Sequence, residues 1–141
     1  MRVPFVRLTR FTRRFAQDQD GAITVEAVLW IPFFFLVLIL ITNAALAFYA
    51  RGEAFRIVQN GNRAFSAHAI ASKEAVETWV EGAFARSTND DAVTTISSDK
   101  TIVTTQLSFP LRDVIAFNTL SLPSSWKITV SSQHYVEWPN S

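Results

Sequence analysis

The stretch that decides the fold is GAITVEAVLWIPFFFLVLILITNAALAFYA, residues 21–50. The 24 residues from Ala27 to Ala50 carry no charge, which is long enough to cross the hydrocarbon core of a bilayer as an α-helix. Glu26 stands at the entrance to this run, and a carboxylate near the bilayer centre costs roughly 2.5–3.5 kcal/mol on insertion scales. A residue with that cost usually has a partner. We therefore expect a transmembrane helix over residues 22–50 that carries one functional carboxylate.

The segment before the apolar run is basic, and we interpret residues 1–21 as a leader. Its charged residues are five arginines and two aspartates: Arg2, Arg7, Arg10, Arg13, Arg14, Asp18 and Asp20. A short cationic arm beside a transmembrane helix marks the cytoplasmic side. The sequence thus predicts a single-pass protein with its N-terminus in the cytoplasm and its C-terminal part outside.

Residues 51–86 have the periodicity of juxtamembrane helices. An apolar three-four spacing continues from the span, on the positions Phe48, Phe55, Val58, Asn62, Phe65 and Ala69. Gly61 weakens this helix and would allow a break or kink there. A second helix is expected after Ser72, which can cap it. Its apolar face is Val76, Trp79, Val80, Ala83 and Phe84, and its solvated side is Lys73, Glu74, Glu77 and Glu81.

Residues 87–141 change to the period of strands and predict a small β-rich head. We expect a hairpin of residues 92–97 and 101–109, and a helical turn over residues 113–117. A last strand follows, whose even positions form one apolar face: Trp126, Ile128, Val130, His134, Val136 and Trp138. The fold class is α+β, with a long N-terminal transmembrane helix that continues into an amphipathic helix, a second short helix and a small antiparallel sheet. A chain of 141 residues suits one such domain plus an anchor.

Three residues around the start of the span carry a family resemblance. Gly21, Glu26 five positions later and Pro32 six after that, followed by Phe-rich apolar residues, resemble the TadE-like family. These are pilin-like minor subunits (pseudopilins) of the Flp, or tight-adherence, type IV pilus system. The resemblance covers roughly residues 18–60.

The resemblance implies a function in pilus assembly at the bacterial inner membrane, with the head in the periplasm. It implies cleavage between Gly21 and Ala22 by a prepilin peptidase. It also implies that the carboxylate of Glu26 pairs with the N-terminal amine of a neighbouring pilin or pseudopilin, and that Pro32 kinks the helix. Major Flp pilins have an aromatic residue where this chain has Ala27, and they lack a head of this size. The resemblance therefore favours an accessory subunit over the bulk fibre subunit.

A different class of protein stays open. Ala45-Leu46-Ala47 fits a signal-peptidase site, and cleavage after Ala47 would release an exported soluble binding or adhesion module. Glu26 gains nothing in a discarded signal peptide. The mature N-terminal residue separates the two hypotheses, since it is Ala22 in one and Phe48 in the other.

We assign no catalytic residue, metal ligand or cofactor. Two histidines, His68 between Ala67 and Ala69 on the juxtamembrane helix and His134 on the apolar face of the last strand, are expected to be structural. Asp90-Asp91 is expected to lie in a solvated turn. No HExxH, GxSxG or phosphate-binding glycine loop occurs. The absence of cysteine excludes thiol chemistry and disulfides, and a net charge of +1 gives no case for nucleic-acid binding.

Overall fold

The structure is a computed structural model that describes residues 19–118 and 121–137, with side chains from Val25 onward. The basic leader up to residue 18 and Trp138 lie outside the described residues. The chain divides into two compact units, residues 1–40 and 41–141, which are described separately below. The second unit begins inside the range 22–50 that the sequence assigns to the span.

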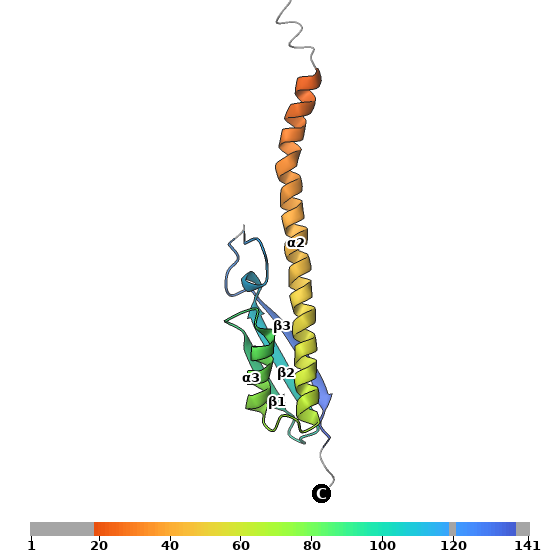
Figure 1. The fold of residues 1–141 in the computed structure, drawn as a ribbon, viewed down its shortest axis with the longest axis vertical. Helices are drawn as coiled ribbons and strands as arrows, with labels where there is room; N and C mark the ends of the chain where they lie inside the picture. The colour runs from red at the N-terminus through yellow and green to blue at the C-terminus, as the bar shows by residue number, and fades with distance from the viewer. Residues whose placement is uncertain (1–18, 119–120, 138–141) are drawn as a thin grey trace, which may run out of the picture. The chain divides into compact units, whose positions relative to one another are not determined.

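A single helix, α2 (Gln19–Ser66), runs from the first unit into the second (Figure 1). It is followed by α3 (Lys73–Phe84), the strands β1 (Asp91–Ile96) and β2 (Ile102–Pro110), a 3₁₀ turn η1 (Leu111–Asp113) and β3 (Lys127–Tyr135). The long apolar helix, short second helix and small antiparallel sheet confirm the predicted α+β class. The helical turn expected over residues 113–117 is wrong in position, because it begins directly after Pro110.

Helix α2 passes through Gly61 without the break that the sequence would allow there. The glycine is explained by packing. A Cβ built on Gly61 would lie 3.0 Å from Cγ2 of Val80 and 3.4 Å from Cγ1 of Val76, both on α3. Glycine therefore lets the two helices approach closely, and this contact offsets the poor helix propensity of the residue.

Helix α3 begins as predicted. The Ser72 hydroxyl accepts a hydrogen bond from the backbone N–H of Ala75 (3.2 Å), which satisfies one of the free donors at the helix start. Val76, Val80 and Phe84 are buried on one face. Trp79 and Ala83 were expected on that face but are exposed.

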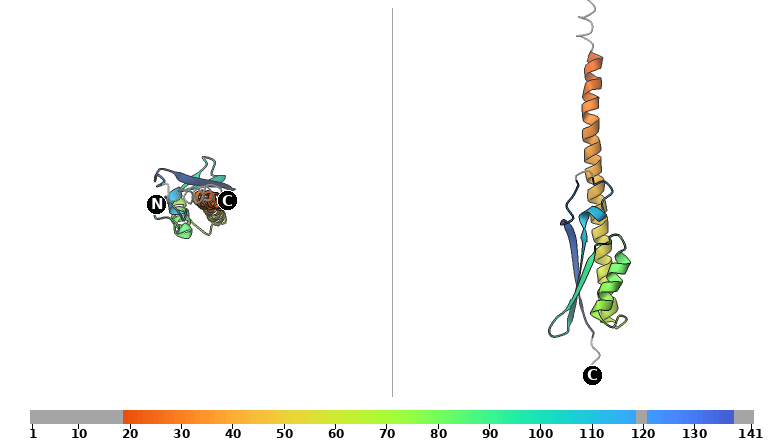
Figure 2. Two further views of the ribbon diagram at one scale, coloured as in Figure 1. Left: turned by 90° about the horizontal axis from the view of Figure 1, so that it is seen from above. Right: turned by 90° about the vertical axis from the view of Figure 1, so that its left-hand side faces the viewer.

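The three strands form an antiparallel sheet in the order β1-β2-β3. Within the second unit, α3 and the C-terminal half of α2 lie on one side of this sheet (Figure 2). The core between them contains apolar side chains from all five elements. It comprises Ala50, Ala54, Val58, Phe65, Val76, Val80, Phe84, Ala92, Val103, Leu107, Phe109, Val114, Val130 and Val136.

The face that α2 presents to this core is a row of every fourth residue: Ala50, Ala54, Val58, Asn62 and Ser66. Residues four apart on a helix form a continuous ridge that can lie in the groove of a packing partner. Phe48 and Phe55, which the sequence placed on the buried face, are exposed instead. Small residues on the ridge let α2 lie close to the sheet, and the larger aromatic rings lie to the side.

A buried polar network joins α2 to all three strands. The amide Nδ2 of Asn62 donates to the backbone oxygen of Ser132 on β3 (2.8 Å). Its Oδ1 accepts from the hydroxyl of Thr105 on β2 (2.5 Å), and that hydroxyl is 3.0 Å from the hydroxyl of Thr94 on β1. Since the Thr105 proton goes to Asn62, Thr94 must be the donor to Thr105. The three strand residues are register partners, so they form one row across the sheet.

The outer edge of β1 is covered by two carboxylates of α3. Glu81 accepts the backbone N–H of Ala92 (3.0 Å) and Glu77 accepts that of Thr94 (2.6 Å). The sequence assigned both glutamates to the solvated side of the helix, and this was wrong. An edge strand leaves every second N–H without a partner in the sheet, and acidic side chains one helical turn apart match that spacing.

The predicted apolar face of the last strand is confirmed for three of its residues and wrong for two others. Val130 and Val136 are buried and Ile128 is half-buried, whereas Trp126 and His134 are exposed. Trp126 precedes the strand, so the alternation of β3 does not apply to it. The ring of His134 lies with Nδ1 2.8 Å from the backbone oxygen of Tyr135 and makes no contribution to the core.

The two glycines of α2 provide a matched stability test. Gly61→Leu should lower the free energy of unfolding by about 1–3 kcal/mol, because the new side chain would collide with α3. Gly52→Leu should raise it by up to about 1 kcal/mol, because a Cβ at Gly52 meets nothing within 4 Å and leucine is the better helix former. Thermal unfolding of the full chain in detergent micelles measures both. Equal melting temperatures would show that α2 and α3 are not in contact at Gly61.

Candidate functional site

The first candidate site is the apolar part of α2 in the first unit. Every residue from Val25 to Leu36 is exposed, so the described residues do not cover this surface. Within the described part of the chain, α2 is the one helix that is long and apolar enough to cross a membrane. A helix that is apolar on all sides needs an apolar environment, either lipid or other helices.

Glu26 lies on this surface. It is exposed and stands one helical turn before Trp30, so the two share a face of the helix. Trp30 begins a cluster of rings, with its centroid 5.6 Å from that of Phe33 and 6.1 Å from that of Phe34. The carboxylate therefore stands at the edge of an aromatic surface, where lipid or a neighbouring helix can reach it.

The other residues of the resemblance lie on the same helix. Gly21 and Ala22 are in its first turn, and Pro32 is inside it. Proline cannot donate to the carbonyl of Val28 one turn earlier. The helix nevertheless continues past Pro32, and a kink there stays a prediction. The structure brings Glu26 and Pro32 onto one continuous apolar helix, in which they lie six residues apart.

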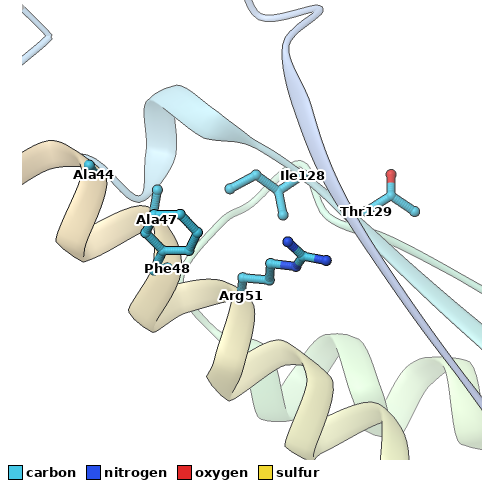
Figure 3. A pocket seen from close by; sticks show the side chains of 6 residues that line it. All are labelled: Ala44, Ala47, Phe48, Arg51, Ile128 and Thr129. Carbon is cyan, nitrogen blue, oxygen red and sulfur yellow. The ribbon is translucent and has the colours of Figure 1, made fainter.

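The second candidate site is an open groove in the head, between α2 and β3 (Figure 3). It encloses about 390 Å³ and is lined by Ala44, Ala47, Phe48, Arg51, Ile128 and Thr129. A neighbouring hollow of about 450 Å³ extends it along α2 to Gly52 and Phe55. In Figure 3 the guanidinium group of Arg51 extends from the helix toward Ile128 and Thr129.

The groove borders the free edge of β3, which is the last strand of the sheet. Its lining offers apolar contact area, one cation and the backbone groups of an edge strand, a combination suited to binding another polypeptide. We therefore regard the groove as an interaction surface.

On the other flank of α2, Arg86 holds the end of α3 against the long helix. Its guanidinium group pairs with Glu53 and lies 5.0 Å from the ring centroid of Tyr49. Glu53 and Tyr49 are four residues apart and thus adjacent on the helix surface. Exposed ion pairs of this kind contribute at most about 1 kcal/mol, so the pair serves orientation more than stability.

A third feature, which the sequence did not predict, ties a loop to α2. The amide of Asn43 donates to the backbone oxygen of Phe117 (2.6 Å) and accepts the N–H of the same residue (3.1 Å). Asn43 is a polar residue within the predicted span, a place where it would suit contact with another helix. The structure instead pairs it with the loop that follows η1.

The residues weighed for catalysis are dispersed. His68 is exposed after the end of α2 in a left-handed conformation (φ 59°), and His134 lies on β3. Asp90 is half-buried, and burial together with the nearby charge of Glu81 raises its pKa. Among the described residues no group of three His, Asp or Glu side chains could hold a metal ion.

Comparisons of the chain with protein-family models, with curated proteins and with solved structures found no match.

Replacing Asn43 tests the tie between the loop and α2. In Asn43→Ala the N–H of Phe117 loses its acceptor, so its hydrogen exchange should accelerate. The expected factor is about tenfold or more, because one hydrogen bond contributes about 1–1.5 kcal/mol. The N–H of Thr105 in the middle of the sheet should exchange as before. Asn60→Ala, at an exposed site on the same helix, is the matched control. Unchanged exchange at Phe117 would mean that the two hydrogen bonds do not order the loop.

Proposed function

We propose that this chain is a membrane-anchored, TadE-like minor pilin subunit that acts in the assembly of a type IVb/Flp pilus. The observation that carries the proposal is the uncovered apolar surface of α2 with a single carboxylate, Glu26, at its beginning. Gly21 and Pro32, at the spacings of that family, support it. The proposed location is the bacterial inner membrane, with the N-terminus in the cytoplasm and the head in the periplasm.

In the proposed mechanism, a prepilin peptidase cleaves between Gly21 and Ala22 and leaves a new amine on Ala22. The apolar half of α2 holds the subunit in the bilayer. Glu26 then favours docking beside the amine of a partner pilin or pseudopilin, because two opposite charges within lipid lower each other's cost. The head, with its groove between α2 and β3, selects which subunit can be the neighbour.

The alternative, a soluble module released after Ala47, fits the contacts of the head less well. Cleavage there would remove Asn43 and with it both hydrogen bonds to Phe117. It would also begin the mature chain in the middle of α2, at Phe48, two residues before the buried Ala50. The head uses α2 from Asn43 onward, which favours a protein that keeps this helix whole.

Processing is the first test. The mature protein should begin at Ala22, as measured by the intact mass of protein purified from membranes. Gly21→Leu should leave the full-length chain in the membrane, because we expect the prepilin peptidase to accept only a small residue at that position. Gly52→Leu, the same change at an uncrowded site of α2, should be processed normally. A mature chain that starts at Phe48 would support release by signal peptidase and contradict the proposal.

The role of Glu26 is the second test. Glu26→Gln keeps the shape and removes the charge, which makes the span less costly to insert. The variant should be inserted and processed at wild-type levels, while pili and crosslinks to partner pilins are lost or reduced. Glu137→Gln, at an exposed position far along the chain, should assemble normally. Full piliation by Glu26→Gln in a strain that lacks the native copy would refute the pairing of charges.

A further inference from the structure

The loop between η1 and β3 is uncharged and rich in apolar residues. The sequence has no charged residue from Val114 to Trp126. The N–H of Leu111 donates to the backbone oxygen of Trp126 (2.8 Å) and closes the base of the loop. Two aromatic side chains are nevertheless exposed, Phe117 by 48% and Trp126 by 56%. A closed loop that exposes large rings and carries no charge is poorly suited to contact with bulk water.

Asn43 determines where along α2 this loop lies. Its two hydrogen bonds hold Phe117 at the level of residue 43 of the helix. The 21 residues from Ala22 to Thr42 rise by about 31 Å as an α-helix, close to the roughly 30 Å of a hydrocarbon core. If these residues span the membrane, Phe117 stands where the hydrocarbon ends and the headgroups begin.

We propose that residues 114–118 and 121–126 form a membrane-contact loop, whose rings Phe117 and Trp126 insert into the interface of the outer leaflet. This inference rests on the proposed membrane anchoring of α2. Tryptophan and phenylalanine are enriched at such interfaces, and the exposed cation of Lys127, directly after the loop, suits lipid phosphates. The head is then held to the bilayer at two points, the helix and the loop.

The opposite end of the sheet differs in chemistry. The β1–β2 turn is polar: Asp99 accepts hydrogen bonds from Ser97 and Thr101, which lower its pKa to about 2. This turn stays charged at neutral pH, so it suits water. The nine residues of β2 separate it from the membrane-contact loop by about 27 Å (Figure 1).

The absence of cysteine makes a labelling experiment clean. Single cysteines are introduced at Ala116 in the loop, at Ser98 in the β1–β2 turn and at Val28 in the span. Each is labelled with an environment-sensitive fluorophore in the full chain, reconstituted in vesicles of phosphatidylethanolamine and phosphatidylglycerol. Quenching by a lipid spin-labelled near the headgroup is compared with quenching by aqueous iodide.

Labels at residues 116 and 28 should be quenched by the lipid and shielded from iodide, with the reverse at residue 98. If residue 28 is quenched by the lipid and residue 116 behaves like residue 98, the anchor stands and the membrane-contact loop is refuted. If residue 28 is not quenched by the lipid, the proposed anchoring fails as well. A label at residue 116 that is shielded from both quenchers would show that protein covers the loop, which also overturns the inference.

The paired change Phe117→Ser and Trp126→Ser should reduce lipid quenching at residue 116 by about half or more, because the apolar area that inserts is lost. Val93→Ser removes an equally exposed apolar side chain from β1 and should leave the quenching unchanged. Equal quenching in all three proteins would contradict insertion of the two rings.

Discussion

The head depends on one buried amide. Asn62 has no exposed surface, and each of its polar atoms must find a partner inside the protein, since an unsatisfied buried group costs about 1–3 kcal/mol. Thr105 and the backbone of Ser132 supply those partners. Because the residues lie in one row across the sheet, the amide sets the rotation of α2 and the register of two strand pairs together. A slip of one residue would turn Thr105 to the other face and leave the amide unpaired.

The short reach of an asparagine requires α2 to lie close to the sheet, which explains the composition of the helix. The buried ridge begins with two small residues, Ala50 and Ala54, and Gly61 gives α3 the same access on the adjacent side. Phe33, Phe34 and their neighbours in the first unit have no such restriction and are large. One helix thus carries two surfaces in succession, a closely fitted one for its own head and an unspecific apolar one for lipid or other helices.

The sequence predicted the elements well because their periods and caps are local signals. The long apolar helix, the Ser72 cap and the β1–β2 hairpin follow from residues close together in the chain. The sequence-based predictions failed where a polar side chain pairs with a residue far away in the chain. Hydropathy cannot distinguish Glu77, which accepts a hydrogen bond from an edge strand, from a solvated glutamate. Asn62 at an apolar position of the helical pattern was the one visible signal of the buried network. The sequence gives no signal for the contact between Asn43 and Phe117, because an amide near the end of a span is equally suited to water, lipid headgroups or another helix.

The proposed site is predictable from sequence to the same extent, since Gly21, Glu26 and Pro32 are near neighbours in the chain. Between Ala22 and Ala50, Glu26 is the only charged residue. Lipid and a neighbouring pilin helix offer nearly the same environment to the apolar side chains around it, so these give little preference for either. A carboxylate does distinguish them, because an amine can be presented by a protein neighbour but not by hydrocarbon. Under the proposed function, the transfer from bilayer to assembly would therefore be directed by one residue, and the head that Asn62 holds in register would determine which neighbour fits.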